Sequence, residues 1–144
     1  MPNEEKLDEK EAVKRLNAAL KLQYSSALQY SIVASSLTGI ESQALGEKLT
    51  AFGDAELADV RRLIEKIVSF GGKPTTDVAK LSFDKSVKGA LKTLVKGEEA
   101  AVEALQEAIE PTGREGRSEA LEHLMEHLIL RKQQQVDFLR RAIS

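Results

Sequence analysis

The stretch Gly53–Phe70, GDAELADVRRLIEKIVSF, decides the fold, because it predicts a long helix whose apolar face is interrupted by two carboxylates. Apolar residues recur every three or four positions here and just upstream, the spacing that places side chains on one face of a helix. Glu56 and Asp59 fall on this same face. An isolated buried carboxylate is costly to desolvate, so the pair predicts a nearby cation, proton or base. The apolar residues of this face are Leu45, Leu49, Phe52, Leu63, Ile67 and Phe70.

Three further segments show the same helical periodicity. Helices are predicted at about residues 10–37, from residue 41 or 42 to 72, from residues 82–85 to 111, and at residues 118–142. Thr38 and Gly39 end the first, and a turn at residues 111–116 precedes the last. The buried faces are predicted to hold Val13, Leu16, Leu20, Gln23, Ala27, Tyr30, Ala34 and Leu37; Val87, Leu91, Leu94, Glu98, Ala101, Val102, Leu105 and Ile109; and Leu121, Leu124, Leu128, Lys132, Gln135, Leu139 and Ala142.

A long irregular segment, GGKPTTDVAKLSFD at residues 71–84, separates the second and third helices. At ~3.3 Å per extended residue it can span about 46 Å, close to the length of a 30-residue helix at ~1.5 Å per residue. This reach allows the second and third helices to run parallel. The sequence therefore predicts an all-α four-helix bundle with a long crossover, formed by residues 1–144 as one domain.

Composition excludes several classes of function. The chain has no cysteine, so disulfides, thiolate metal sites and cysteine nucleophiles are ruled out. The net charge is −2 with both signs interspersed, which gives no electrostatic signature of nucleic-acid binding. No apolar run approaches the ~20 residues that cross a bilayer, and the first residues do not resemble a signal peptide. We therefore expect a cytoplasmic protein without nucleic-acid or membrane partners.

The polar residues on the predicted buried faces all lie near the middle of their helices. In a bundle of similar-length helices these levels coincide, so their side chains are predicted to meet in one internal polar cluster. The residues concerned are Gln23, Glu56, Asp59, Glu98, Lys132 and Gln135.

This arrangement resembles the ferritin-like di-iron bundles, and bacterioferritin in particular. The resemblance extends over almost the whole chain and rests on the segments LKLQYSSALQY, FGDAELADVRRLIEKI, GGKPTTDVAKLSFD, KGEEAAVEALQEAI and VDFLRRA. That family places a carboxylate on the first and third helices and an E-x-x-H motif on the second and fourth. The resemblance implies a ferritin-like fold, a role in iron homeostasis and a homo-oligomer, with a dimer as the default and a larger assembly as an alternative.

Several ligand positions of the family are changed in this chain. Gln23 replaces the glutamate of the first helix, Glu56 and Asp59 stand at the first E-x-x-H, and Glu98 matches the glutamate of the third helix. The second E-x-x-H has become Lys132 and Gln135.

Two further positions bear on cofactors and assembly. Tyr30 matches the tyrosine that lies beside the di-iron site in the family. Leu57 stands where bacterioferritins carry the haem-ligating methionine, so no haem is expected. The short fifth helix of bacterioferritins is not predicted, which argues against the standard bacterioferritin cage.

Two interpretations of the polar cluster follow. Two irons normally require about four carboxylates and two imidazoles, whereas this set offers three carboxylates, two amides and an ammonium. In the first interpretation, Lys132 replaces the charge of the metals, and protonation, Arg131 or water balances the remaining negative charge. In the second, one divalent metal such as iron binds Glu56, Asp59 and Glu98. The first predicts a non-catalytic or weakly metal-binding bundle without ferroxidase activity. The second predicts an iron-binding or iron-storage protein with a mononuclear or atypical metal site.

His123 and His127 are spaced to chelate a metal, but they flank the buried face of the fourth helix. We interpret them as a surface pair.

Overall fold

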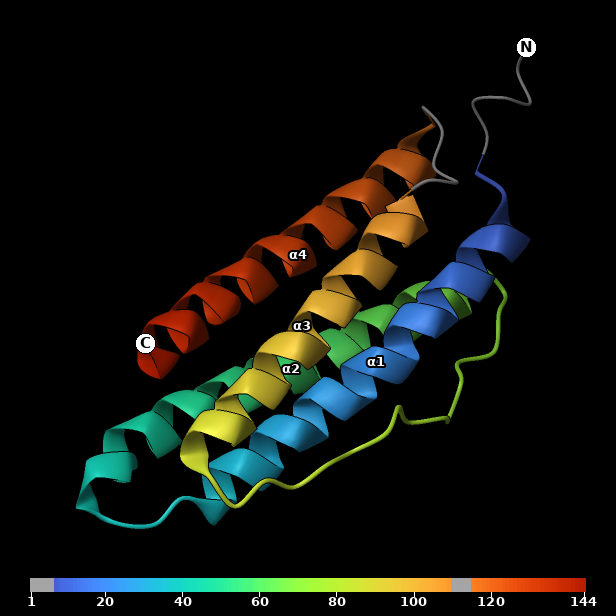
Figure 1. The fold of residues 1–144 in the computed structure, drawn as a ribbon. Coiled ribbons are helices and arrows are strands. Elements are labelled where there is room, and N and C mark those ends of the chain that lie inside the picture. The colour runs from blue at the N-terminus through green and yellow to red at the C-terminus, as the bar shows by residue number, and fades with distance from the viewer. Residues whose placement is uncertain (1–6, 110–114) are drawn as a thin grey trace.

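The computed structural model describes residues 7–109 and 115–144 (Figure 1). Within these ranges the chain forms four long α-helices and one short 3-10 helix, with no strand. The elements are α1 (Glu9–Ser36), η2 (Ile40–Ser42), α2 (Gln43–Ser69), α3 (Val87–Ile109) and α4 (Gly116–Ile143). The predicted all-α four-helix architecture is confirmed.

The long connection between α2 and α3 crosses the full length of the bundle. Figure 1 shows α1 and α2 side by side and antiparallel, with the connection returning along α1 to the end where α2 began. As a result α3 runs parallel to α2, and α4 runs antiparallel to α3. The predicted crossover is therefore confirmed.

Local capping fixes where the helices begin and end. The side chain of Asp8 caps α1 by accepting a hydrogen bond from the Glu11 amide at 3.1 Å. Gly39 and Gly71 follow α1 and α2 with φ of 87° and 77°, values that favour glycine. The Ser86 hydroxyl accepts from the Gly89 amide at 2.9 Å, which starts α3 at Val87.

The late start of α3 corrects two predictions. The third helix was expected to begin at residues 82–85, and Val87 was expected on its buried face. Because Val87 is instead the first residue of α3, it lies at the end of the bundle and is 40% exposed. Ala142, next to the last residue of α4, is exposed for the same reason. The predicted end of the third helix and most of the turn at 111–116 lie outside the described residues.

The core consists of two apolar clusters separated by a polar layer. One cluster includes Leu16, Leu63 and Leu121. The other includes Leu49, Leu91 and Leu139. The polar layer lies between them along the bundle axis, so its side chains are shielded at both ends by packed hydrocarbon.

The crossover is bound to α1 by side-chain amides. Asn17 donates to the carbonyl of Lys73 at 3.0 Å and accepts from the amide of Thr75 at 2.8 Å. Gln29 donates to the carbonyl of Ser82 at 2.7 Å and accepts from its amide at 3.1 Å. Each amide side chain thus satisfies one donor and one acceptor of an extended backbone that has no neighbouring strand.

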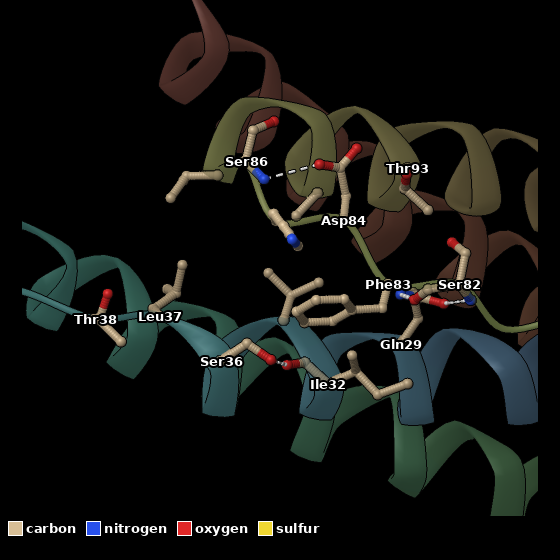
Figure 2. Close-up of a pocket in the computed structure, with 14 residues that line it drawn as sticks. Gln29, Ile32, Ser36, Leu37, Thr38, Ser82, Phe83, Asp84, Ser86 and Thr93 are labelled. Carbon is tan, nitrogen blue, oxygen red and sulfur yellow. Dashed lines mark hydrogen bonds between the residues drawn. The ribbon is translucent and has the colours of Figure 1, made fainter.

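A shallow pocket of about 70 Å³ lies where the end of the crossover meets α1 and α3 (Figure 2). Its lining includes Gln29, Val33, Phe83 and Val87, and Phe83 is 65% exposed. In the part of the chain described here, none of the helices combines the length and apolar character needed to cross a membrane.

Candidate functional site

All four helices contribute to a buried group of side chains at mid-height in the bundle, which we name the central polar cluster. Every member is at most 2% exposed. Helical periodicity places these positions inward on each helix, at the level between the two apolar clusters. The members are Gln23 and Tyr30 from α1, Glu56 from α2, Glu98 from α3, and Lys132 and Gln135 from α4.

Lys132 lies between the two carboxylates of this cluster. Its Nζ is 2.7 Å from Glu56 Oε2 and 3.1 Å from Glu98 Oε1. One ammonium therefore bridges α2 and α3 from α4. Charge-assisted hydrogen bonds of this length are among the stronger ones that proteins form.

Gln135 makes a second bridge between the same carboxylates. Its Nε2 is 2.9 Å from Glu56 Oε1, 2.6 Å from Glu98 Oε2 and 3.4 Å from the Tyr30 hydroxyl. Lys132 thus binds one carboxylate oxygen of each acid, and Gln135 binds the other oxygen of each. The Oε1 of Gln135 is buried without a hydrogen-bond partner.

The two α1 residues complete the hydrogen bonding of the acids. Gln23 Nε2 donates to the backbone carbonyl of Glu56 at 2.9 Å and to Glu56 Oε2. The Tyr30 hydroxyl donates to Glu98 Oε2 at 3.1 Å. Every carboxylate oxygen of the cluster therefore accepts at least one hydrogen bond.

The pKa values of the two acids in the cluster are shifted in opposite directions. Burial raises the pKa of Glu98 to about 8, against the opposing pull of the Lys132 charge. Burial acts the same way on Glu56, but the Lys132 charge and the hydrogen bonds outweigh it and hold the pKa of Glu56 below its usual value. For Lys132, burial favours the neutral form, yet the two carboxylates raise its pKa. These shifts favour the ionised form of Glu56, the protonated form of Glu98 and the charged form of Lys132, a combination with no net charge.

Asp59 does not join this cluster. It is fully buried, but it turns toward the edge between α2 and α4, where Arg62 Nη1 lies 2.7 Å from its Oδ1. Arg131 Nη2 forms an ion pair with its other oxygen. The sequence predicted Arg131 as a balancing charge but did not single out Arg62. The signal for Arg62 is its position three residues after Asp59, a spacing at which helical side chains contact each other.

The donor set does not fit a di-iron centre. An ammonium cannot ligate a metal, and here it lies between the acids that would have to bridge two irons. In addition, no group of three or more His, Cys, Asp or Glu residues is arranged to hold a metal ion within residues 7–109 and 115–144.

The other residues considered at the sequence level lie outside the cluster. His123 and His127 are exposed on α4, and His123 Nδ1 is 3.8 Å from Glu126. Leu57, at the position of the haem methionine, is 46% exposed on the outer surface of α2.

Comparison with known proteins gives one family and several similar folds. Residues 13–144 match the family model described as a ferritin-like domain. No curated protein sequence matches the chain significantly.

Three solved structures illustrate the similarity of fold. A ferritin-like, diiron-carboxylate protein from Bacillus anthracis str. Ames is 24% identical, with a TM-score of 0.88, covering 95% of this chain and 98% of that one. Rhodobacter capsulatus bacterioferritin, solved with a metal-free dinuclear site and haem iron, is 21% identical with a TM-score of 0.80, covering 92% and 82%. The dodecameric thioferritin of Bacteroides fragilis, a bacterioferritin-related protein, is 19% identical with a TM-score of 0.84, covering 94% and 86%. The family match spans most of the sequence, and the chain therefore belongs to the ferritin-like family.

Proposed function

We propose that this protein is a non-catalytic ferritin-like bundle in which the ammonium of Lys132 replaces the charge of the metals. The observation that carries this proposal is the position of Lys132 Nζ, 2.7 Å from Glu56 and 3.1 Å from Glu98. A divalent cation bound by Glu56 and Glu98 would be repelled by the ammonium that already contacts both acids. The bundle then needs no metal to neutralise its core, and it has no centre at which iron is oxidised.

Anaerobic Fe(II) addition followed by exposure to air tests this proposal. We expect Fe(II) to oxidise no faster than in buffer, and elemental analysis of the washed protein to find far less than one iron per chain. Fast oxidation with iron retained in stoichiometric amounts would show that the core is a working metal centre and would overturn the proposal.

Replacing Lys132 with Glu tests the role of the ammonium directly. The variant puts an acid where the family's second E-x-x-H begins, so the core either gains affinity for iron or unfolds through like-charge repulsion. Lys14→Glu, on the exposed surface of α1, is the matched control and should change neither property. If Lys132→Glu leaves both iron affinity and stability unchanged, Lys132 does not neutralise the acids.

A second candidate function is iron binding at a mononuclear site made by Glu56, Asp59 and Glu98. It is favoured by the burial of three acids on α2 and α3, each at most 1% exposed. Such a site requires Asp59 to leave Arg62 and Arg131 and turn toward Glu56. It predicts a melting temperature that rises with added Fe(II), whereas the lysine-neutralised core predicts one that does not.

We further propose that the protein forms a homo-oligomer through the outer surface of α1 and α2, with a dimer as the basic unit. Leu28 on α1 and Leu57 on α2 are each 46% exposed, and Leu81 of the adjoining crossover is 37% exposed. Exposed leucines on neighbouring elements are typical of a surface that another molecule covers. The dodecamer reported for the Bacteroides fragilis protein is consistent with assembly of this fold.

A further inference from the structure

The charges of α3 run opposite to the direction that its own helix dipole favours. A helix is stabilised by acids near its N-terminus and bases near its C-terminus. In α3, Lys88, Lys92 and Lys96 occupy the N-terminal half, and Glu99 and Glu103 follow. The neighbouring helix α4 has the favourable order, with acids toward its start and two arginines in its last turn. The reversed order in α3 therefore does not serve the stability of that helix.

Because α3 and α4 are antiparallel neighbours, this reversal places like charges side by side (Figure 1). The bond between Arg140 Nη2 and Glu99 Oε2, at 2.9 Å, shows that these two residues share one surface, which we name the α3–α4 face. The spacing of three or four residues between the other charges places them on the same side of each helix. Lys92, Lys96 and Arg140 also line one shallow groove on it. The basic half of the face consists of Lys88, Lys92, Lys96 and Arg140, with Asp137 and the Arg140-bound Glu99 as the acids among them. The acidic half consists of Glu103, Glu119, Glu122 and Glu126.

Most of these charges have no partner inside the bundle. No ion pair within the described ranges involves Lys92, Lys96, Glu103 or Glu122. If acids on one helix lay beside bases on the other, these side chains would be paired across the two helices. Leu130 lies between the halves, one helical turn beyond Glu126, and is 58% exposed. The α3–α4 face thus presents an apolar centre with an excess of positive charge at one end and of negative charge at the other.

We propose that the α3–α4 face docks against the same face of a second copy, in antiparallel orientation. A two-fold axis that lies in the contact plane, perpendicular to the helices, brings the basic half of each copy onto the acidic half of the other, and Leu130 near its counterpart. A two-fold axis along the helices would instead set like charges against each other, so the charges select the antiparallel arrangement.

The size of the face is adequate for this contact. α3 has 23 residues, which corresponds to about 35 Å at ~1.5 Å per residue. Two adjacent helices are about 20 Å wide, so the face measures about 700 Å² per copy, near the ~800 Å² of a standard interface. A polyanion would satisfy the basic half alone and would be repelled by the acidic half, whereas a second copy satisfies both.

Paired charge reversals test the docking. One variant, Lys92→Glu with Lys96→Glu, makes the face predominantly acidic, and the other, Glu122→Lys with Glu126→Lys, makes it predominantly basic. Sedimentation velocity should show self-association of the parent protein at about 50 mM NaCl. The association constant should fall at least about tenfold at about 500 mM NaCl. Each variant alone should lose this salt-sensitive step, and an equimolar mixture of the two should regain it.

Other outcomes separate this proposal from the proposed α1–α2 contact and from iron chemistry. A Lys10→Glu, Lys14→Glu variant on the exposed surface of α1 is the matched control and should associate like the parent. Association through apolar residues of α1 and α2 persists in high salt, so its presence or absence does not alter the salt-sensitive step. The proposal is overturned if the mixture forms no complex, or if the parent shows no salt-sensitive association. In the latter case, inorganic polyphosphate that binds the parent and not the Lys92→Glu, Lys96→Glu variant would assign the basic half to a polyanion instead.

Discussion

Lys132 is the residue on which the charge balance of the core depends. Its ammonium is 1% exposed and contacts two carboxylates that are equally buried. A buried ion pair contributes little net stability relative to a well-packed apolar core, because desolvation offsets most of the attraction. Removing one partner is different, since it leaves a buried charge without compensation.

Replacing Lys132 with Met should therefore destabilise the protein strongly. Met preserves most of the volume but leaves ionised Glu56 with amide donors alone, and we expect the free energy of unfolding to fall by about 3–5 kcal/mol. Urea denaturation measures the change. Adding Glu56→Gln should recover part of the loss, and Lys14→Met should stay within about 0.5 kcal/mol of the parent. Parent-like stability of Lys132→Met would contradict the ion-pair description.

Glu98 should make stability depend on pH in the neutral range. The native state keeps its proton up to a pKa of about 8, whereas the unfolded chain releases it near 4.5. Between these values the unfolded state binds fewer protons, so this contribution lowers the free energy of unfolding as pH rises, and it becomes constant above 8.

Urea denaturation of a Glu98→Gln variant at pH 6, 7, 8 and 9 tests this dependence. Glu98→Gln cannot titrate and should remove a slope of at most about 1.4 kcal/mol per pH unit between pH 6 and 8. Glu103→Gln, on the exposed side of α3, should keep the parent slope. An identical slope in both variants would show that Glu98 does not hold the proton.

The meeting of the polar residues could be predicted from sequence, but the partners of Asp59 could not. Spacing gives the height of a residue along a helix and the face on which it lies, and these are enough to bring Glu56, Glu98 and Lys132 together. Asp59 lies three positions beyond Glu56, so it is rotated about 60° around the helix. That rotation directs it to the α2–α4 edge and Arg131, a difference that depends on how the helices are packed.

At the scale of elements, the crossover is the feature that the sequence described least. Its length predicted that it could span the bundle, yet nothing in its composition indicated what would hold it there. The crossover is held by α1, whose Asn17 and Gln29 side chains bind the crossover backbone. A lone amide on a helix has no sequence signature that separates a solvated side chain from one that binds a distant loop.

Replacing Gln29 with Ala should loosen the crossover locally. Gln29 is 8% exposed, and its loss leaves the amide and carbonyl of Ser82 without their partner. We expect a loss of about 1–3 kcal/mol in the free energy of unfolding. Hydrogen exchange should accelerate at Ser82 and its neighbours while the α4 amides stay protected. The exposed Gln134→Ala variant serves as control; unchanged exchange at Ser82 would show that Gln29 does not hold the crossover.

At the scale of the whole molecule, the exposed leucines of α1 and α2 determine the expected assembly. Leu57→Glu places a charge on the proposed apolar contact and should weaken self-association at least about tenfold, because a buried interface cannot accommodate an unpaired carboxylate. Light scattering after size-exclusion chromatography measures the mass in solution. The melting temperature of the single chain should change little, since Leu57 is already 46% exposed.

Ile40→Glu is the control for this prediction, because Ile40 is 87% exposed in the short connection between α1 and α2. It should retain the mass of the parent. If Leu57→Glu also retains that mass in high salt, the α1–α2 surface is not the contact between copies.

The position of Lys132 in α4 has a consequence for the order in which the core is completed during synthesis. Glu56 and Glu98 leave the ribosome 76 and 34 residues before Lys132 does. At roughly 5–20 residues per second, Glu56 waits for roughly 4–15 seconds before its cation emerges. During that interval the acids have no ammonium to pair with in the core and must stay hydrated. We therefore expect the nascent chain to keep its core open until α4 has emerged, and then to close it in one step, independently of the supply of metal in the cell.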